Sequence, residues 1–183
     1  MPQKIAEFKN LYVSYGEGDA LKGVSLEIDR LEHTAILGAN GSGKSTLIKL
    51  FSNDIYPRVR PDSSKMLFGQ ERWSIFELKK RLGIITNDFH YYALHTVPNI
   101  SCFELVVSSF FSSVGVFESQ EYDAEMIESA KAAIEQVGIT ALSDKPLCEM
   151  STGELRKTLI ARALALRPEA LLLDEPTVGL DIG

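Results

Sequence analysis

Residues 38–45, Gly-Ala-Asn-Gly-Ser-Gly-Lys-Ser, decide the fold of this chain. They fit the pattern GxxxxGK followed by Ser or Thr at every fixed position, and such a loop joins a strand to a helix. Residues 33–37 (HTAIL) predict a short buried strand before the loop, and residues 45–52 (STLIKLFS) predict a helix after it. In this order, the backbone N–H groups of the loop and the helix dipole can meet a bound phosphate group.

The candidate phosphate-binding residues lie in the loop and in the first turn of the helix that follows it. Its glycines let the backbone curl until successive N–H groups face an anion. Lys44 is placed to reach β- and γ-phosphates and is a candidate catalytic residue, while the Ser45 hydroxyl suits Mg²⁺. The loop alone does not choose among nucleotide hydrolases, because GTPases, kinases and motor proteins share it. The candidate ATP-binding residues of this segment are Gly38, Ala39, Asn40, Gly41, Ser42, Gly43, Lys44, Ser45 and Thr46.

Two carboxylates, Asp174 and Glu175, follow the apolar run at 170–173. We expect this run to be a buried strand of a parallel sheet, whose carboxyl end shares a crevice with the phosphate loop. Asp174 is the candidate partner of Mg²⁺, through water, because Mg²⁺ keeps much of its hydration shell. Glu175 is the candidate general base that orients the attacking water. A turn or helix start without chemistry is the alternative for these two residues.

The composition argues against a nucleic-acid partner. The 183 residues include 19 Lys and Arg against 25 Asp and Glu, a net charge of −6. No basic surplus is therefore present to release counterions from a phosphate backbone. The two cysteines, Cys102 and Cys148, lack the spacing of a zinc site, so we expect free thiols in a reducing compartment.

No stretch reaches the roughly 18–20 apolar residues that a membrane span needs. The nearest approach, at 105–117, is too short and is interrupted by four serines: Ser108, Ser109, Ser112 and Ser113. Met1 leads directly into a strand pattern rather than into a secretory signal. We therefore expect a cytoplasmic chain that can lie against a membrane only through a partner.

Hydrophobic periodicity predicts the remaining elements. Strands are predicted at 4–15, 20–29, 65–69 and 83–86, and helices at 74–82, 101–114, 122–137 and 154–166. The fold class that these elements indicate is α/β: a mixed, mainly parallel sheet with an antiparallel β subdomain. The segment at about 98–166 is predicted to be a helical subdomain inserted into that core.

Residues 150–154, Met-Ser-Thr-Gly-Glu, precede a helical run and the carboxylate pair. Together with the phosphate loop, they resemble the signature loop of ATP-binding-cassette proteins, which usually contains Leu-Ser-Gly-Gly-Gln. Thr152 and Glu154 are departures from that pattern. The resemblance covers nearly the whole chain and implies a P-loop NTPase core that binds and hydrolyses ATP with Mg²⁺.

The resemblance also implies roles that spacing alone does not. Tyr15 matches the aromatic residue that stacks on adenine, and Asp181 matches an aspartate at the dimer interface. Asn87 stands where the family has a glutamine that contacts Mg²⁺; asparagine is one methylene shorter, so we expect slower hydrolysis. The family pairs two copies head to tail, so that the signature loop meets the ATP of the partner subunit; here that loop comprises Ser151, Thr152, Gly153 and Glu154.

The resemblance is greatest to the subunits that drive membrane permeases at the inner face of the cell membrane, importers of metal complexes above all. Family members continue past the position of Asp181 to a switch histidine, and His33, His90 and His95 all precede the signature loop. We therefore expect residues 1–183 to be a single nucleotide-binding domain that is incomplete at its C-terminus. Two alternatives are a soluble ATPase of this family without a permease, and a nucleotide-binding module with impaired hydrolysis.

Overall fold

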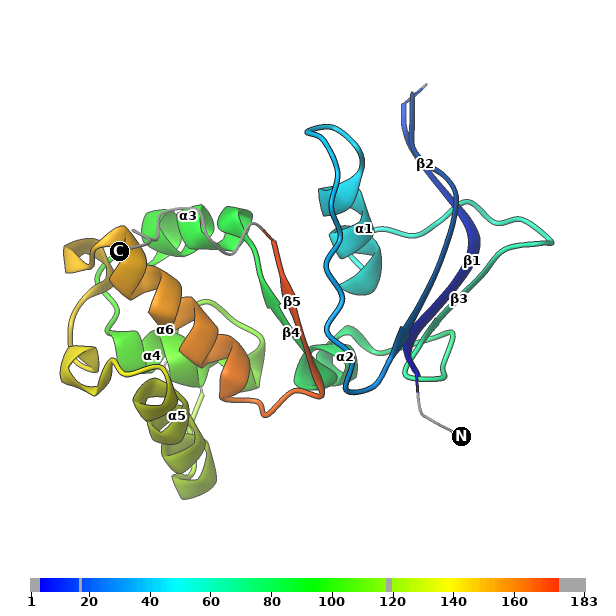
Figure 1. The fold of residues 1–183 in the computed structure, drawn as a ribbon. Coiled ribbons are helices and arrows are strands. Elements are labelled where there is room, and N and C mark those ends of the chain that lie inside the picture. Colours follow the sequence, from blue (N-terminus) through cyan, green and yellow to red (C-terminus); the bar gives the residue numbers. More distant parts are fainter. Residues whose placement is uncertain (1–3, 17, 118–119, 175–183) are drawn as a thin grey trace. The chain divides into compact units, whose positions relative to one another are not determined.

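A computed structural model describes residues 4–16, 18–117 and 120–174 of the chain. The backbone divides into two compact units, 1–78 and 79–183, each of which is described by itself (Figure 1). Within the described residues, no helix combines the length and the apolar character that a membrane crossing requires.

The first unit contains a three-stranded antiparallel sheet. Its strands are β1 (Lys4–Tyr15), β2 (Gly18–Asp29) and β3 (Ser64–Leu67), in the order β2-β1-β3. In β1 the buried positions change parity: Ala6 and Phe8 are buried on one side of a register shift, and Leu11 and Val13 on the other. The shift is a bulge that keeps all four apolar side chains facing the core. The predicted antiparallel β subdomain is confirmed.

Helix α1 (Lys44–Phe51) packs its apolar face against this sheet. The ring of Phe51 lies against that of Phe8 in β1, with ring centroids 4.8 Å apart, and Leu50 is fully buried beside it. Aromatic contacts of this kind contribute about 0.5–1.5 kcal/mol beyond the burial of area. The sheet therefore fixes the helix that begins at the end of the phosphate loop.

The predicted strand at 33–37 is wrong. Residues 32–39 form neither helix nor strand, and all of 31–40 are exposed, Leu37 to 92%. The apolar run Ala-Ile-Leu meets the local pattern of a strand, but a strand also needs a neighbour to accept and donate its ladder hydrogen bonds. The described strands pair only as β2-β1-β3 and β4-β5, so this segment has no such neighbour among them.

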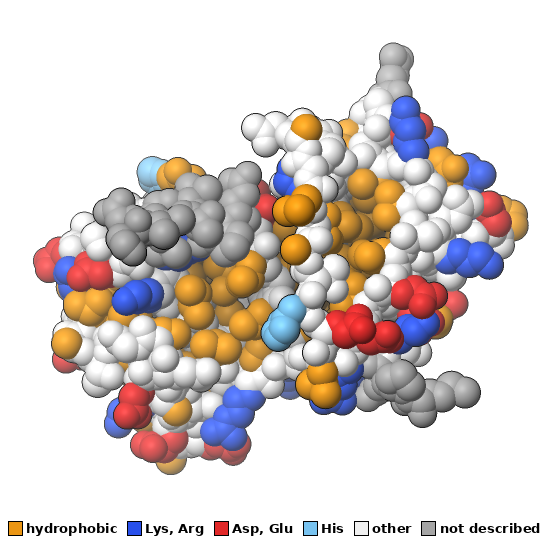
Figure 2. Space-filling model, in the orientation of Figure 1, with side chains coloured by type: hydrophobic (Ala, Val, Ile, Leu, Met, Phe, Trp, Pro, Cys, Tyr) orange, Lys and Arg blue, Asp and Glu red, His pale blue; other side chains and the backbone are white. Residues whose placement is uncertain are grey.

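The second unit contains two parallel strands, β4 (Leu82–Ile85) and β5 (Ala170–Leu173). Their register pairs Leu82 with Ala170 and Ile85 with Leu173. The expectation of a buried β5 is wrong for alternate residues, since Leu171 and Leu173 are 43% and 45% exposed. Among the described strands β5 pairs with β4 alone, and hydrophobic side chains reach the surface of this unit (Figure 2).

Helices make up most of the second unit. Helix α2 (Ile75–Arg81) contains the boundary between the two units and precedes β4 in the sequence. Helix α3 (Asn87–Thr96) follows β4, although the sequence did not predict it. The remaining helices and short 3₁₀ segments are α4 (Cys102–Val107), η1 (Ser108–Phe111), α5 (Ala124–Gln136), η2 (Thr140–Leu142), η3 (Leu147–Glu149) and α6 (Thr152–Leu164).

Helix α4 is shorter than the helix predicted at 101–114. It ends at Val107, and the chain continues as a 3₁₀ turn. The Ser108 hydroxyl donates to the carbonyl oxygen of Leu105 at 2.7 Å and lies 3.2 Å from that of Ser113. Serine side chains that bond to nearby carbonyl groups compete with continued α-helix, which explains the early end.

Helices α4, α5 and α6 share one core. Small residues on α5 and α6 (Ala130, Ala133 and Ala161) let these helices approach, and Val106 and Ile134 fill the space between them. Each helix starts at a side-chain cap, formed by Ser101, Asp123 and Ser151 respectively. The signature segment at the start of α6 is thus held by a packed helical layer. The boundaries of the predicted helical subdomain, 98–166, stay a prediction.

Gly83 in β4 allows the strand to lie against α6. A Cβ atom added there would lie 2.6 Å from Leu171 Cδ2, 3.1 Å from Pro168 Cγ and 3.3 Å from Ala163 Cβ. We expect Gly83→Val to lower the free energy of unfolding by about 1–3 kcal/mol, the usual cost of overpacking. Urea denaturation with an unchanged slope measures this loss. The matched control is Gly18→Val, where the nearest atom to an added Cβ is 3.7 Å away; an equal loss in both variants would contradict the explanation.

Candidate functional site

The phosphate loop adopts a backbone that only glycine accepts at its last bend. Gly41 and Gly43 have φ angles of 78° and 92°, in the left-handed region. A Cβ on Gly43 would lie 2.7 Å from the carbonyl oxygen of Ala20 and 2.7 Å from Leu21 Cδ2, both in β2. The loop therefore presses its backbone onto the sheet at Gly43. That close approach explains the glycine directly before the lysine.

Lys44 lies against the curl of the loop. Its Nζ donates to the carbonyl oxygens of Gly38 at 2.8 Å and Ala39 at 2.9 Å, and Ser42 N donates to Ala39 O at 3.2 Å. The ammonium is thus held by the segment that the sequence assigned to phosphate. To contact a phosphate, it exchanges neutral carbonyl acceptors for charged oxygens, which form stronger hydrogen bonds.

The start of α1 offers backbone donors rather than a cap. Its N-cap is Gly43, no side chain caps the helix, and no acidic residue lies in the first turn. The first N–H groups of a helix have no intrahelical acceptor, and the helix dipole adds positive potential there. Ser45 is exposed at this end, whereas Thr46 is only 9% exposed. The arrangement suits an anion such as a phosphate group.

Tyr15 ends β1 in the same unit, and its side chain is 52% exposed. An exposed ring at a strand end is available for stacking on a base, as its predicted role requires. Stacking on adenine stays a prediction.

Asp174 and Asn87 leave the β4–β5 sheet at the same edge. The strands are parallel and end in register at Ile85 and Leu173, and Asp174 N donates to Ile85 O at 2.9 Å. Asn87 is the first residue of α3, after the N-cap Thr86, whose hydroxyl accepts a hydrogen bond from Phe89 N at 3.3 Å. The two predicted Mg²⁺ contacts therefore lie on neighbouring chain segments. The phosphate loop belongs to the other unit, so its juxtaposition with Asp174 stays a prediction.

Glu175 and Asp181, the candidate general base and interface aspartate, lie outside the described residues. Among residues 4–16, 18–117 and 120–174, no cluster of three His, Cys, Asp or Glu side chains could hold a metal by itself. Mg²⁺ in nucleotide sites uses one or two carboxylates together with phosphates and water. The Ser45 hydroxyl of one unit and the Asp174 carboxylate of the other are each a ligand type that suits Mg²⁺; that they share one ion stays a prediction.

Sequence reasoning missed Arg156 as a contact of this edge. Arg156 lies on α6 with only 2% exposure, and its Nη2 donates to the carbonyl oxygen of Asp174 at 3.0 Å. It links the helix that begins at the signature segment to the residue after β5. The available signal was a charged residue on the apolar side of a predicted helix.

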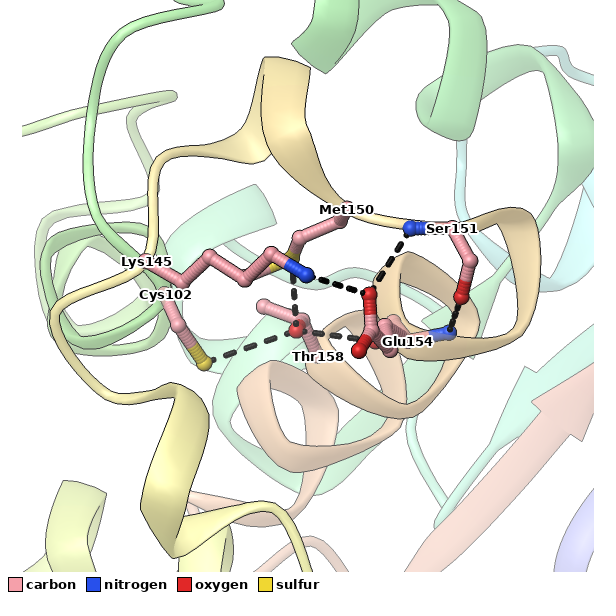
Figure 3. Close-up of polar contacts among 6 residues, drawn as sticks. All are labelled: Cys102, Lys145, Met150, Ser151, Glu154 and Thr158. Atoms are coloured by element: carbon pink, nitrogen blue, oxygen red, sulfur yellow. Dashed lines mark hydrogen bonds and ion pairs between the residues drawn. The ribbon is translucent and has the colours of Figure 1, made fainter.

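Ser151 and Glu154 form a capping box at the start of α6 (Figure 3). The Ser151 hydroxyl accepts from Glu154 N at 3.3 Å, and Glu154 Oε2 accepts from Ser151 N at 2.8 Å. The same Oε2 atom lies 2.9 Å from Lys145 Nζ. The Lys145 ammonium, followed by the backbone N–H of Ser151, holds the pKa of Glu154 below its usual range. Glu154 is therefore a carboxylate whose charge has a cation beside it.

Thr158 supports this segment from one turn below. Its hydroxyl lies 3.0 Å from the Glu154 carbonyl oxygen, 3.4 Å from Cys102 Sγ and 3.5 Å from Met150 Sδ (Figure 3). Burial raises the pKa of the Cys102 thiol, which therefore stays neutral. The contacts tie the residues on both sides of the signature loop to α4.

Half-buried Arg162 joins α6 to the segments before it. Its Nη2 donates to the Ser113 carbonyl oxygen at 2.7 Å, and its guanidinium lies 4.7 Å from the centroid of the Phe89 ring. Burial lowers the pKa of Arg162 to about 10, so the side chain is still charged near neutral pH.

A family comparison matches this architecture. The family model described as ABC transporter matches residues 21–178, a span that includes the phosphate loop, the signature segment and Asp174. The chain belongs to the ABC transporter family. It is an ATPase domain of that family, and the predicted fold class, a P-loop NTPase core with an antiparallel β subdomain, is confirmed.

Named relatives of this ABC transporter domain include two import ATP-binding proteins. The phosphate import ATP-binding protein PstB of Pyrobaculum aerophilum is 34% identical, over 94% of this chain and 69% of the relative. The zinc uptake system ATP-binding protein ZurA of Listeria innocua is 32% identical, over 98% of this chain and 66% of the relative.

Among solved structures, cbiO1 of Clostridium perfringens, part of the ABC transporter complex cbiONQ, has a TM-score of 0.77 at 32% identity. That match covers 98% of this chain and 68% of cbiO1. The chain spans from 29% of one curated relative's length to 78% of another's.

We expect Ser151→Ala to lower the free energy of unfolding by about 1 kcal/mol, because it removes the acceptor of Glu154 N at the start of α6. Chemical denaturation measures the difference. Ser143→Ala is the matched control, since Ser143 is a half-buried serine of the same unit that does not cap a helix through its side chain. A loss in the control as large as in Ser151→Ala would show that the cap is not the cause.

Proposed function

We propose that this chain binds and hydrolyses MgATP at a head-to-tail dimer interface and so powers transport through a membrane permease. The observation that carries the proposal is the phosphate loop, with its glycine-only bend at Gly43, its lysine held inside the curl, and an uncapped helix start directly after it. Each of these features favours a bound triphosphate.

The residues divide the chemistry among them. The loop amides and Lys44 bind the β- and γ-phosphates and offset the charge that develops on them during phosphoryl transfer. Ser45 and Asp174 would hold Mg²⁺, which supplies further neutralisation of the phosphate oxygens when it is bound. Glu175 orients the attacking water and accepts its proton, and Asn87 would contact Mg²⁺ and that water. Tyr15 stacks on the adenine ring.

The signature segment of a second copy completes the site. In the capping box of α6, side chains satisfy the backbone N–H groups of Ser151 and Glu154, which leaves those of Thr152 and Gly153 at the helix start. Free amides there favour contact with a γ-phosphate presented by the partner subunit. Asp181 lies at the same dimer interface in this proposal.

The partner that consumes this energy is proposed to be an integral membrane permease, with the chain bound at the inner face of the cell membrane. Three relatives support this proposal. PstB and ZurA are named as ATP-binding proteins of import and uptake systems, and cbiO1 is part of an ABC transporter complex. We favour a metal complex as cargo because ZurA serves zinc uptake. The net charge of −6 argues against a nucleic-acid partner.

ATP with Mg²⁺ should raise the melting temperature of the protein, and Lys44→Ala should abolish that shift. Ligand at a hundred times its dissociation constant adds about 2.7 kcal/mol of stability, which differential scanning fluorimetry detects. Lys49→Ala is the matched control, because Lys49 is an exposed lysine in the last turn of the same helix. A shift that survives in Lys44→Ala would mean that the loop is not the nucleotide site.

Glu175→Gln should keep ATP binding but reduce turnover by at least about a hundredfold, because glutamine cannot accept the proton of the attacking water. Phosphate release measures turnover, and light scattering should show an ATP-bound dimer that accumulates. Normal phosphate release from this variant would refute the role of Glu175 as general base.

A further inference from the structure

Glu154 places a carboxylate in the first turn of α6, the turn that is proposed to contact the triphosphate of a facing copy. It is the third residue of α6, at the position of the neutral glutamine in the Leu-Ser-Gly-Gly-Gln pattern that the signature segment resembles. A negative charge at a helix start opposes the positive potential that attracts an anion. The proposed contact with the partner subunit's γ-phosphate therefore needs that charge to be offset.

Lys145 supplies the offset from a separate element. Its Nζ is 2.9 Å from Glu154 Oε2, and it is the cation that the structure pairs with Glu154 within the described residues. The backbone of Lys145 is itself fixed: its N–H donates to Leu142 O at 3.0 Å, and its carbonyl oxygen accepts from Cys102 N at 3.1 Å. The backbone that carries this lysine is thus hydrogen-bonded to the start of α4.

The geometry also orients the carboxylate. One oxygen, Oε2, accepts both from Lys145 and from the backbone N–H of Ser151, so the lysine holds Glu154 in the position that closes the capping box (Figure 3). In this position Glu154 is turned back onto Ser151, and the two bonds of the capping box engage the N–H groups of Ser151 and Glu154 but not those of Thr152 and Gly153.

We propose that Lys145 is a positioning residue of the signature loop: it fixes Glu154 in the capping box and cancels its charge, so that the first turn of α6 can accept the triphosphate of a facing copy. This inference rests on the proposed head-to-tail function. The pair of Lys145 and Glu154 then presents no net charge to the facing triphosphate.

If Lys145 and Glu154 formed an ion pair that only stabilised the fold, removing Lys145 would lower the melting temperature of the nucleotide-free protein. The side chains of Lys145 and Glu154 are 30% and 31% exposed, and pairs so accessible to water add little to stability. Loss of Lys145 should therefore leave the melting temperature of the nucleotide-free protein nearly unchanged. Its effect should instead appear when a second negative group approaches the loop.

The test uses the protein in a Glu175→Gln background, which should retain bound ATP. The ATP concentration for half-maximal dimerisation is measured by light scattering for the parent and for Lys145→Met, Lys145→Arg, Glu154→Gln and the double variant Lys145→Met/Glu154→Gln. We expect Lys145→Met to raise this concentration by at least about tenfold, because an uncompensated carboxylate then faces the triphosphate. Lys145→Arg and the double variant should stay within about threefold of the parent.

Salt provides an independent readout. At about 1 M salt the Debye length is about 3 Å, so the ratio between Lys145→Met and the parent should shrink. A Lys145→Met variant that dimerises like the parent would overturn the proposal, as would a defect that Glu154→Gln fails to rescue. If the Glu175→Gln parent itself does not dimerise with ATP, the proposed function fails, which separates the two results.

Discussion

Backbone N–H groups at helix starts have no acceptor within the helix, and much of this molecule is organised around two such starts. Helix α1 begins at a glycine without any side-chain cap, so its amides face outward beside Lys44. Helix α6 has Ser151 as its N-cap, and a reciprocal capping box engages the amides of Ser151 and Glu154 but not the two between them. The sheet of the first unit and the helical layer of the second hold these starts in place. One start is open, and the other is partly closed by its own carboxylate.

Local patterns carried the correct predictions. The glycine loop and its lysine are defined by spacing over eight residues, and the structure forms a curl there because Gly41 and Gly43 adopt positive φ angles. The strands at β1 and β5 and the helices α5 and α6 likewise follow from alternation or from helical spacing with a capping residue at the start. Each of these features depends on residues that are close in the sequence.

Features that depend on distant partners could not be predicted in this way. The segment 33–37 has the composition of a strand, but no described strand pairs with it. The exposure of alternate residues in β5 has the same origin, because burial of a strand requires neighbours on both sides. Lys145 escaped attention since nothing in its sequence context signals that it meets Glu154, and Arg156 appeared only as part of a helix. The role of Asp181 rests on the family resemblance, and that of Glu175 on its place directly after Asp174 in the sequence.

The hydrogen bond from Arg156 to the carbonyl oxygen of Asp174 connects α6 to the end of β5. The guanidinium is almost wholly enclosed and grips a carbonyl group at the end of β5. The positions of α6 and of the end of β5 are therefore coupled through this one hydrogen bond. In the head-to-tail dimer that we propose, a movement of α6 caused by the nucleotide of the opposite copy would reach Asp174 of the same chain along this route.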